Sequence, residues 1–468
     1  MGGLRATIET VGERRLKPVV DRQRPGLWKV ALALISLALS LLLWINGLLE
    51  SLDRPSVGND LVIRQLELAA LAAPQVSPSL HDLLIGENPE AALLEEIERQ
   101  SRPENDPLRA LLQLNGPEPS RARPLLETLR DGGDPATAAL AARLLAEPGS
   151  TDPGRPQPEL PGSDPLLRRL SCLALGGSGS SCALPREERQ AFFQLIGVTL
   201  LPSLAALGGV LLIGREIWLR WRGLVPEPPP LLGPPLGVID VILLVAGGFV
   251  LLGEVATPLL ITPLISGALH GLAIESPLAD GLSVLLLYLG LMAAPLTILA
   301  LMLGGQRPEG GWLQYRWRPV GSALRKGLKG LLIVLPLVSL ASWLQQLVWS
   351  DPGGSNPLLE LVLRSTSPLA LFCFAFTAIV LAPLFEETIF RGVLLPVLVR
   401  QLGAGWGVVV SSAVFALAHL SLSELAPLFV LGLALGWLRL ASGRLSASIW
   451  LHALWNGLTF SNLVLLGS

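Results

Sequence analysis

Two adjacent carboxylates, Glu386 and Glu387, stand at the end of an apolar run in the stretch LAPLFEETIFRG. On a helix, Glu387 and Arg391 are four residues apart and share a face, so they can form an ion pair. Glu386 is turned by about 100° from its neighbour and is left without that cation. An ionisable group in an apolar setting is costly, which makes it a candidate for function. Glu386 can therefore act as a general base, although both glutamates could instead cap the edge of the apolar run together with Arg391.

Two of the four histidines lie in later apolar runs, each with a neighbour one helical turn away. Phe415 and His419 share a face in AVFALAHLS, and His452 and Asn456 share a face in SIWLHALWNG. A lone histidine in a membrane is often a packing residue that makes one hydrogen bond. Two histidines with an asparagine beside the second favour a functional interpretation.

Together these groups supply what hydrolysis of an amide by water requires. Glu386, helped by His419, would deprotonate and orient a water molecule. His452 and Asn456 would donate hydrogen bonds to the oxyanion of the tetrahedral intermediate. The assignment involves no metal and no organic cofactor. Cys373 lies in the middle of an apolar run without an evident base beside it, and we interpret it as a packing residue.

Three other functions compete with this hypothesis. Glu386, His419 and His452 could form the two-histidine, one-carboxylate set of a zinc peptidase, although the sequence has no H-E-x-x-H helix and Asn456 would then lack an evident role. A membrane scaffold or immunity protein could keep the fold without activity, but the site residues are all present. A transporter is disfavoured because the polar groups gather in one half of the chain, without a matching inverted repeat.

The composition indicates an all-α, polytopic membrane protein. Half of the residues (51%) are hydrophobic, 15% are charged and the mean hydropathy is +0.55, which is far from a soluble domain. Runs rich in Leu, Ala and Gly reach the length that crosses a bilayer. The net charge of −2 and the lack of a long basic stripe argue against a general nucleic-acid binder. The sequence predicts about nine transmembrane helices, near 30–49, 191–213, 236–258, 279–303, 330–349, 367–388, 405–421, 425–441 and 446–465.

The chain divides into a short basic start, a retained signal anchor, one long polar stretch and two groups of spans. The polar stretch contains amphipathic pieces such as PEAALLEEIERQ, broken by Pro and Gly, and is predicted to be a helical soluble region inserted between spans. The partners expected are the lipid bilayer and a peptide or protein substrate, and the oligomeric state stays open. The predicted segments are 1–29, 30–49, 51–188, 191–303 and 330–465.

The charges of the loops predict the orientation. Even-numbered spans are followed by basic residues, whereas odd-numbered spans are followed by little Lys or Arg. Positive charge favours the cytoplasmic side, so we expect a cytoplasmic N-terminus and an extracytoplasmic region 51–188. The basic exits are Arg215, Arg220 and Arg222; Arg307, Arg316, Arg318, Arg325, Lys326 and Lys329; Arg391 and Arg400; and Arg439 and Arg444.

Two of the three cysteines, Cys172 and Cys182, lie in SCLALGGSGSSC at the end of the predicted soluble region. An oxidising compartment would allow them to close a small loop. We predict that they form a disulfide, the alternative being two free thiols in a flexible loop.

The order E-E-x-x-x-R, F-x-x-x-H and H-x-x-x-N resembles the CPBP family of intramembrane glutamic endopeptidases. That family includes the type II CAAX prenyl endopeptidases and the bacterial abortive-infection proteins. The motifs read EETIFR (386–391), FALAH (415–419) and HALWN (452–456), and the resemblance covers about 330–465. It implies that Glu386 is the catalytic base, with His419 as its partner and His452 and Asn456 as the oxyanion site. It also implies that Glu387 and Arg391 are a structural pair and that a lipidated peptide is one candidate substrate.

One conflict remains within this interpretation. Straight spans would place Glu386 and His452 toward the cytoplasmic side but His419 toward the opposite end of a short span. Either the helices tilt, or the helix that carries Glu386 continues past Arg391.

Overall fold

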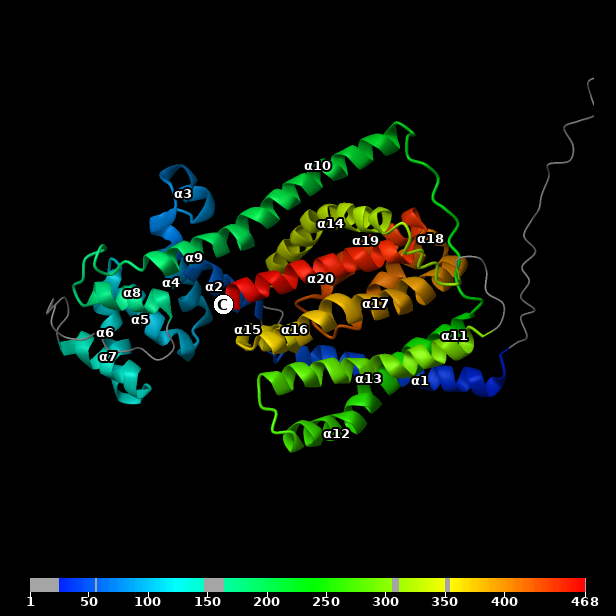
Figure 1. Cartoon of the computed structure of the whole chain (residues 1–468), viewed down its shortest axis with the longest axis horizontal. Coiled ribbons are helices and arrows are strands. Elements are labelled where there is room, and N and C mark those ends of the chain that lie inside the picture. Colours follow the sequence, from blue (N-terminus) through cyan, green and yellow to red (C-terminus); the bar gives the residue numbers. More distant parts are fainter. Residues whose placement is uncertain (1–24, 55–56, 147–163, 305–310, 350–353, 468) are drawn as a thin grey trace, which may run out of the picture.

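The computed structural model describes residues 25–54, 57–146, 164–304, 311–349 and 354–467. Every regular element within these ranges is helical, which confirms the all-α membrane bundle predicted from the sequence. Most of the predicted basic start, residues 1–24, lies outside the described residues, as does Arg307. The helices of the bundle run roughly side by side, and the helices of the polar stretch gather at one end of it (Figure 1).

Within the described ranges, eight helical runs are long and apolar enough to cross a membrane. One of them, Pro368–Leu417, contains two of the predicted spans and is interrupted at Gly403, which has φ 80° and ψ 169°. The chain folds back there, and Gly407 then packs directly against Val399. A Cβ on Gly407 would lie only 2.9 Å from the backbone nitrogen of Val399. The eight runs therefore agree with about nine crossings. Accordingly, the helix that starts the bundle and the helix that ends it have their outer ends at opposite ends of the bundle (Figure 1).

The first half of the bundle is built from long helices with short connections. A π-helical segment, η5, joins two α-helices into one span, where the wider turn loosens the regular hydrogen-bond pattern. Its elements are α1 (Leu27–Ser51), α10 (Leu201–Trp221), α11 (Val238–Ile242), η5 (Leu243–Ala256), α12 (Thr257–Gly271), α13 (Leu278–Met302) and α14 (Val320–Val348).

The second half carries the predicted site and also contains π-helical turns. A short helix precedes it, and a hairpin of two helices follows the turn at Gly403. Its elements are α15 (Pro357–Arg364), α16 (Pro368–Phe376), η6 (Thr377–Leu381), α17 (Ala382–Glu387), η7 (Thr388–Leu394), α18 (Leu395–Leu417), α19 (Leu425–Ser442) and α20 (Leu445–Gly467).

The polar stretch forms a compact set of short helices with its own apolar core, which includes Leu93, Ile97 and Leu170. Side-chain caps fix some of the helix starts: the Asn88 carboxamide oxygen accepts a hydrogen bond from the Ala91 amide at 3.0 Å. The elements are α2 (Val57–Ala72), η1 (Ala73–Gln75), α3 (Pro78–Leu84), α4 (Pro89–Gln100), η2 (Pro103–Asn105), α5 (Asp106–Asn115), η3 (Pro119–Arg121), α6 (Ala122–Gly132), α7 (Pro135–Ala146), α8 (Pro165–Ala174) and α9 (Pro185–Leu195).

The last helix of the polar stretch runs without a break into the first helix of the bundle that follows it. Helix α9 continues through the π-helical turn η4 (Ile196–Leu200) into α10, so the second span begins inside a helix of the polar stretch. The predicted disulfide between Cys172 and Cys182 is present just before it.

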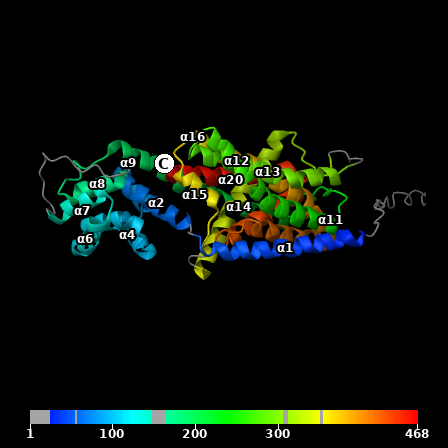
Figure 2. The same ribbon diagram turned by 90° about the horizontal axis from the view of Figure 1, so that it is seen from below.

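Helix α1 packs against η5 along a narrow stripe. Four of its five buried residues, Ala33, Ser36, Ser40 and Trp44, follow helical spacing, and three of these four are small. The Ser40 hydroxyl donates to the carbonyl of Ala246 at 3.0 Å. The first span therefore belongs to the bundle, running along its side (Figure 2), and carries Trp44 into the interior.

Candidate active site

The turn at Gly403 brings Glu386 and His419 together. Glu386 lies 17 residues before Gly403 and His419 lies 16 residues after it, so an antiparallel pair of helices holds both side chains at one level. The helix that carries Glu386 continues past Arg391 to this turn, which resolves the conflict between the straight spans. Glu386 consequently lies about midway along its helical limb. Arg391 is fully buried within the helix, so its assignment to a basic loop was wrong.

The carboxylate of Glu386 has one oxygen in a hydrogen bond and one facing both histidines. The Tyr288 hydroxyl donates to Glu386 Oε1 at 3.1 Å. Glu386 Oε2 has no hydrogen-bond partner within the part of the chain that the structure describes. It lies 3.8 Å from His452 Nε2 and 4.0 Å from His419 Nε2. Both separations are too long for a direct hydrogen bond but allow one oxygen atom to bridge them.

The other ring nitrogen of each histidine is held by an acceptor. His419 Nδ1 donates to the carbonyl of Phe415 at 2.8 Å, and His452 Nδ1 donates to Glu387 Oε1 at 3.1 Å. A carbonyl oxygen can only accept, so the neutral tautomer of His419 carries its lone pair on Nε2. The contacts therefore direct both Nε2 atoms toward Glu386.

The loop after α18 fixes the position of His419. The Arg54 guanidinium donates to the Leu420 carbonyl at 2.8 Å, and the Gln345 amide donates to the Ser423 carbonyl at 2.9 Å. The Ser421 hydroxyl adds a bond of 2.7 Å to the Gly354 carbonyl. Residues from the ends of α1 and α14 thus hold the loop in place.

Glu387 and Arg391 form a buried ion pair at 2.9 Å, with side chains that are 0% and 1% exposed. Arg391 Nη2 also donates to the Gly432 carbonyl at 3.3 Å, and its guanidinium lies 4.2 Å from the centre of the Phe415 ring. Phe415 further contacts the rings of both histidines. Through Glu387 and Phe415, this cluster contacts the rings of His452 and His419 and supports them.

Asn456 is engaged with the backbone of the preceding span. Its amide donates to the Ala378 carbonyl at 2.8 Å. In the π-helical turn η6 the amide of Ala382 bonds to the carbonyl of Thr377, and the next amide in that register would come from residue 383. Residue 383 is a proline and has no N–H. Asn456 therefore supplies the hydrogen bond that Pro383 cannot, and it retains a second N–H.

A match to a known protein family identifies the part of the chain that contains these residues. Residues 368–458 match the family model of the type II CAAX prenyl endopeptidase Rce1-like proteins. The chain carries an Rce1-like domain of the CAAX protease family. Residues 58–193 match a domain of unknown function, DUF8675. Neither the curated proteins nor the solved structures give a match.

The Rce1-like domain contains all seven residues that were predicted from the sequence to form or support the site. The match is narrower than the predicted 330–465 and begins at the start of α16. The chain is therefore an integral, multi-pass membrane protein with a domain of a protease family.

Three residues outside the Rce1-like domain were missed from the sequence, and one of them contacts the candidate site directly. Tyr288 lies on α13 and bonds to Glu386. Glu254 lies on η5, and the Trp44 indole donates to its Oε2 at 3.3 Å. Glu254 is a carboxylate inside a predicted span, and this alone could have marked it as a candidate. Nothing in the spacing of Tyr288 or Trp44 indicates their contacts, which join spans far apart in the sequence.

The geometry does not fit a preformed zinc site. Donor atoms around a tetrahedral zinc stand about 3.3 Å apart, which is closer than the 3.8 and 4.0 Å that separate Glu386 Oε2 from the two histidines. Within the described ranges, no group of three His, Cys, Asp or Glu side chains could hold a metal ion. We derive no catalytic step through a metal.

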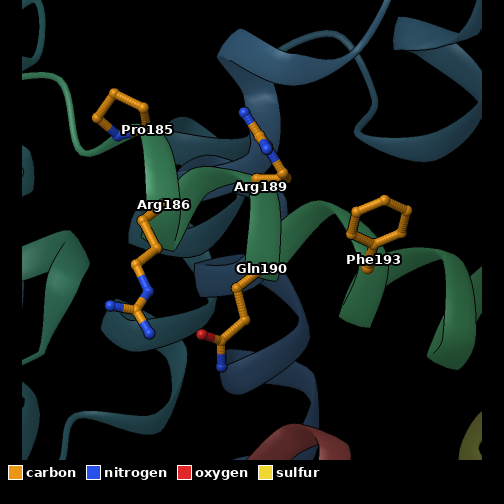
Figure 3. A pocket seen from close by; sticks show the side chains of 5 residues that line it. All are labelled: Pro185, Arg186, Arg189, Gln190 and Phe193. Carbon is orange, nitrogen blue, oxygen red and sulfur yellow. The ribbon is translucent and has the colours of Figure 1, made fainter.

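Two surface hollows lie away from the Rce1-like site. One, of about 470 Å³, lies on α9, where Arg186, Arg189 and Phe193 spread outward (Figure 3). The other, of about 560 Å³, lies between α2 and α15 and is lined by charged residues that include Glu67. Burial raises the pKa of the Glu67 carboxyl to about 7, against the lowering effect of Arg64. Neither hollow is lined by a residue of the predicted site.

Proposed function

We propose that this chain is an intramembrane endopeptidase that hydrolyses peptide bonds with a water molecule activated by glutamate. The observation that carries the proposal concerns Oε2 of Glu386, which has no hydrogen-bond partner among the described residues and faces the Nε2 atoms of both histidines. The Glu386 side chain is 15% exposed. The coarser assignment to a membrane protease rests on the match of residues 368–458.

In the proposed reaction Glu386, helped by His419, takes a proton from water while the water oxygen attacks the carbonyl carbon of the peptide bond. A tetrahedral intermediate forms with the negative charge on the former carbonyl oxygen. When it collapses, the carbon–nitrogen bond breaks and the proton passes from Glu386 to the leaving amine. The products are a carboxylic acid, which then ionises by releasing its proton to water, and an amine, and no redox partner is needed.

The oxyanion is assigned to His452 and Asn456. Because His452 Nδ1 donates its proton to Glu387, a second donor from this ring has to be Nε2–H of the imidazolium. Glu387 is placed to stabilise that cation. Asn456 uses one N–H on Ala378 and has the other for the substrate. Hydrogen bonds preorganised in this way contribute strongly to the stabilisation of developing charge.

The expected substrates are peptides or proteins held at the membrane, because the site lies about midway along a transmembrane helical limb. A lipidated peptide is one such class. We further propose that the N-terminus is cytoplasmic and that the region 51–188 lies on the other side. The contacts of Arg400 with Pro234 and of Arg444 with Arg316 support this, because they gather the basic loops at one end of the bundle.

A comparison of membrane peptides from cells that carry wild-type protein or Glu386→Gln tests the proposal. A protease leaves peptides with new termini only in the wild-type cells, and these peptides identify the substrate. Identical peptide profiles would favour the scaffold hypothesis. Loss of cleavage after exhaustive chelation, restored by zinc, would favour the metallopeptidase.

A further inference from the structure

The catalytic carboxylate is held from outside the Rce1-like domain. Tyr288 donates its only proton to Glu386 Oε1 at 3.1 Å, and its ring packs edge-on against Phe385 at 6.3 Å. A phenol has one O–H, so it can donate to only one acceptor at a time. The bond fixes the rotation of the carboxylate, and therefore which oxygen faces the histidines.

A second carboxylate, Glu254, stands close enough to interact electrostatically with both Tyr288 and Glu386. If it were free, it would compete with Glu386 for the phenol proton. Trp44, which is 8% exposed, donates its indole N–H to Glu254 Oε2 at 3.3 Å. An indole N–H can only donate, so this contact occupies Oε2 of Glu254 and makes that oxygen less available to accept from Tyr288.

We propose that Tyr288 is a positioning residue for the general base Glu386, and that Trp44 secures this arrangement by holding Glu254. The inference rests on the proposed function of Glu386. It means that α1, η5 and α13 belong to the catalytic unit, although the family match covers only residues 368–458.

The physical reason is that a general base works only if the oxygen that receives the proton is correctly aimed. Without Tyr288, Glu386 Oε1 would lose its partner, and the carboxylate could rotate away from His419 and His452. Ground-state binding of the peptide does not depend on this rotation, because Tyr288 acts on the base. Loss of the hydroxyl is therefore expected to lower kcat and leave KM largely unchanged.

The test compares Tyr288→Phe with Tyr315→Phe in the full-length protein reconstituted in lipid. Tyr315 is the other tyrosine of the chain, and its hydroxyl bonds to Thr388 at 2.6 Å rather than to Glu386. We expect Tyr288→Phe to lower kcat by about 10- to 100-fold, with KM within twofold of wild type and a Tm similar to that of Tyr315→Phe. Equal kcat for the two variants, or a loss that appears only in KM, would overturn the proposal.

Trp44→Phe provides a second measurement if Tyr288→Phe folds poorly. It leaves Tyr288 in place and releases Glu254, so kcat should fall at unchanged KM. A wild-type kcat in Trp44→Phe would overturn the role of Trp44. Glu386→Gln measured beside them separates the two proposals. If that variant is active, the glutamate mechanism fails; if it is inactive while Tyr288→Phe is fully active, only the positioning role fails.

Discussion

The side chain of Asn456 and the backbone of Ala378 are joined by a hydrogen bond of 2.8 Å that crosses between the last span and the span that carries Glu386. This bond completes the π-helical turn before Pro383. Asn456 is thus a structural residue as well as a candidate oxyanion donor, and the two roles can be separated by experiment.

We predict that Asn456→Ala lowers turnover by about 10²–10³ and the free energy of unfolding by about 1–3 kcal/mol, since the Ala378 carbonyl loses its donor. Adding Pro383→Ala supplies a backbone N–H in that register. The double variant should regain stability without regaining turnover. Turnover that returns together with stability would show that Asn456 acts only through the fold.

The buried pair of Glu387 and Arg391 predicts a large effect on stability. Glu387→Gln leaves Arg391 without its counter-ion in an apolar interior, which should cost about 3–5 kcal/mol. The matched control is Glu360→Gln, because Glu360 pairs with Arg364 at the same spacing but with side chains 43% and 79% exposed. That control should change the free energy of unfolding by about 0–1 kcal/mol. If both variants unfold at the same denaturant concentration, the burial argument is wrong.

The disulfide between Cys172 and Cys182 predicts protection of the soluble region. Replacing both cysteines by serine should lower its stability by up to about 2–3 kcal/mol, because a short loop is no longer constrained in the unfolded chain. Cys373→Ser, which removes the free cysteine, is the control. Protein that is denatured and then alkylated without a reducing agent should carry one modified cysteine, Cys373. Labelling of all three cysteines would contradict the bridge.

The orientation predicts opposite reporter activities at two sites. A fusion at residue 120, in the polar stretch, should be active when the reporter works only outside the cytoplasm and inactive when the reporter works only inside it. A fusion at residue 227, in the proline-rich connector between α10 and α11, should show the opposite pattern. The connector and the polar stretch lie at opposite ends of the bundle (Figure 1). Cytoplasmic activity of the fusion at residue 120 would invert the topology.

The sequence alone was sufficient to predict contacts between residues of the same helix. The four-residue spacing predicted that Glu387 and Arg391 could pair, and 2.9 Å separates their atoms. The apolar runs predicted the bundle because span length follows from bilayer thickness. The basic loops were predicted from the ends of the apolar runs. This prediction was wrong at Arg391, because its helix continues as far as Gly403, and at Arg439, which is buried inside α19.

Contacts between distant spans could not be predicted. The bond from Tyr288 to Glu386 joins residues 98 positions apart, and the bond from Trp44 to Glu254 joins residues 210 apart. Spacing within a helix does not determine which faces of two helices meet. The approach of His419 to Glu386 depends on the left-handed backbone of Gly403, and hydrophobic periodicity does not locate such a turn.

The most direct test of the account is the turnover of purified Glu386→Gln, with wild-type protein beside it and thermal stability recorded on the same samples. Glutamine keeps the shape of the side chain and an acceptor for Tyr288, but it cannot take a proton from water. We predict a fall in turnover on the order of 10²–10⁴, with a Tm close to that of wild type. Equal turnover in the two proteins would contradict catalysis by Glu386.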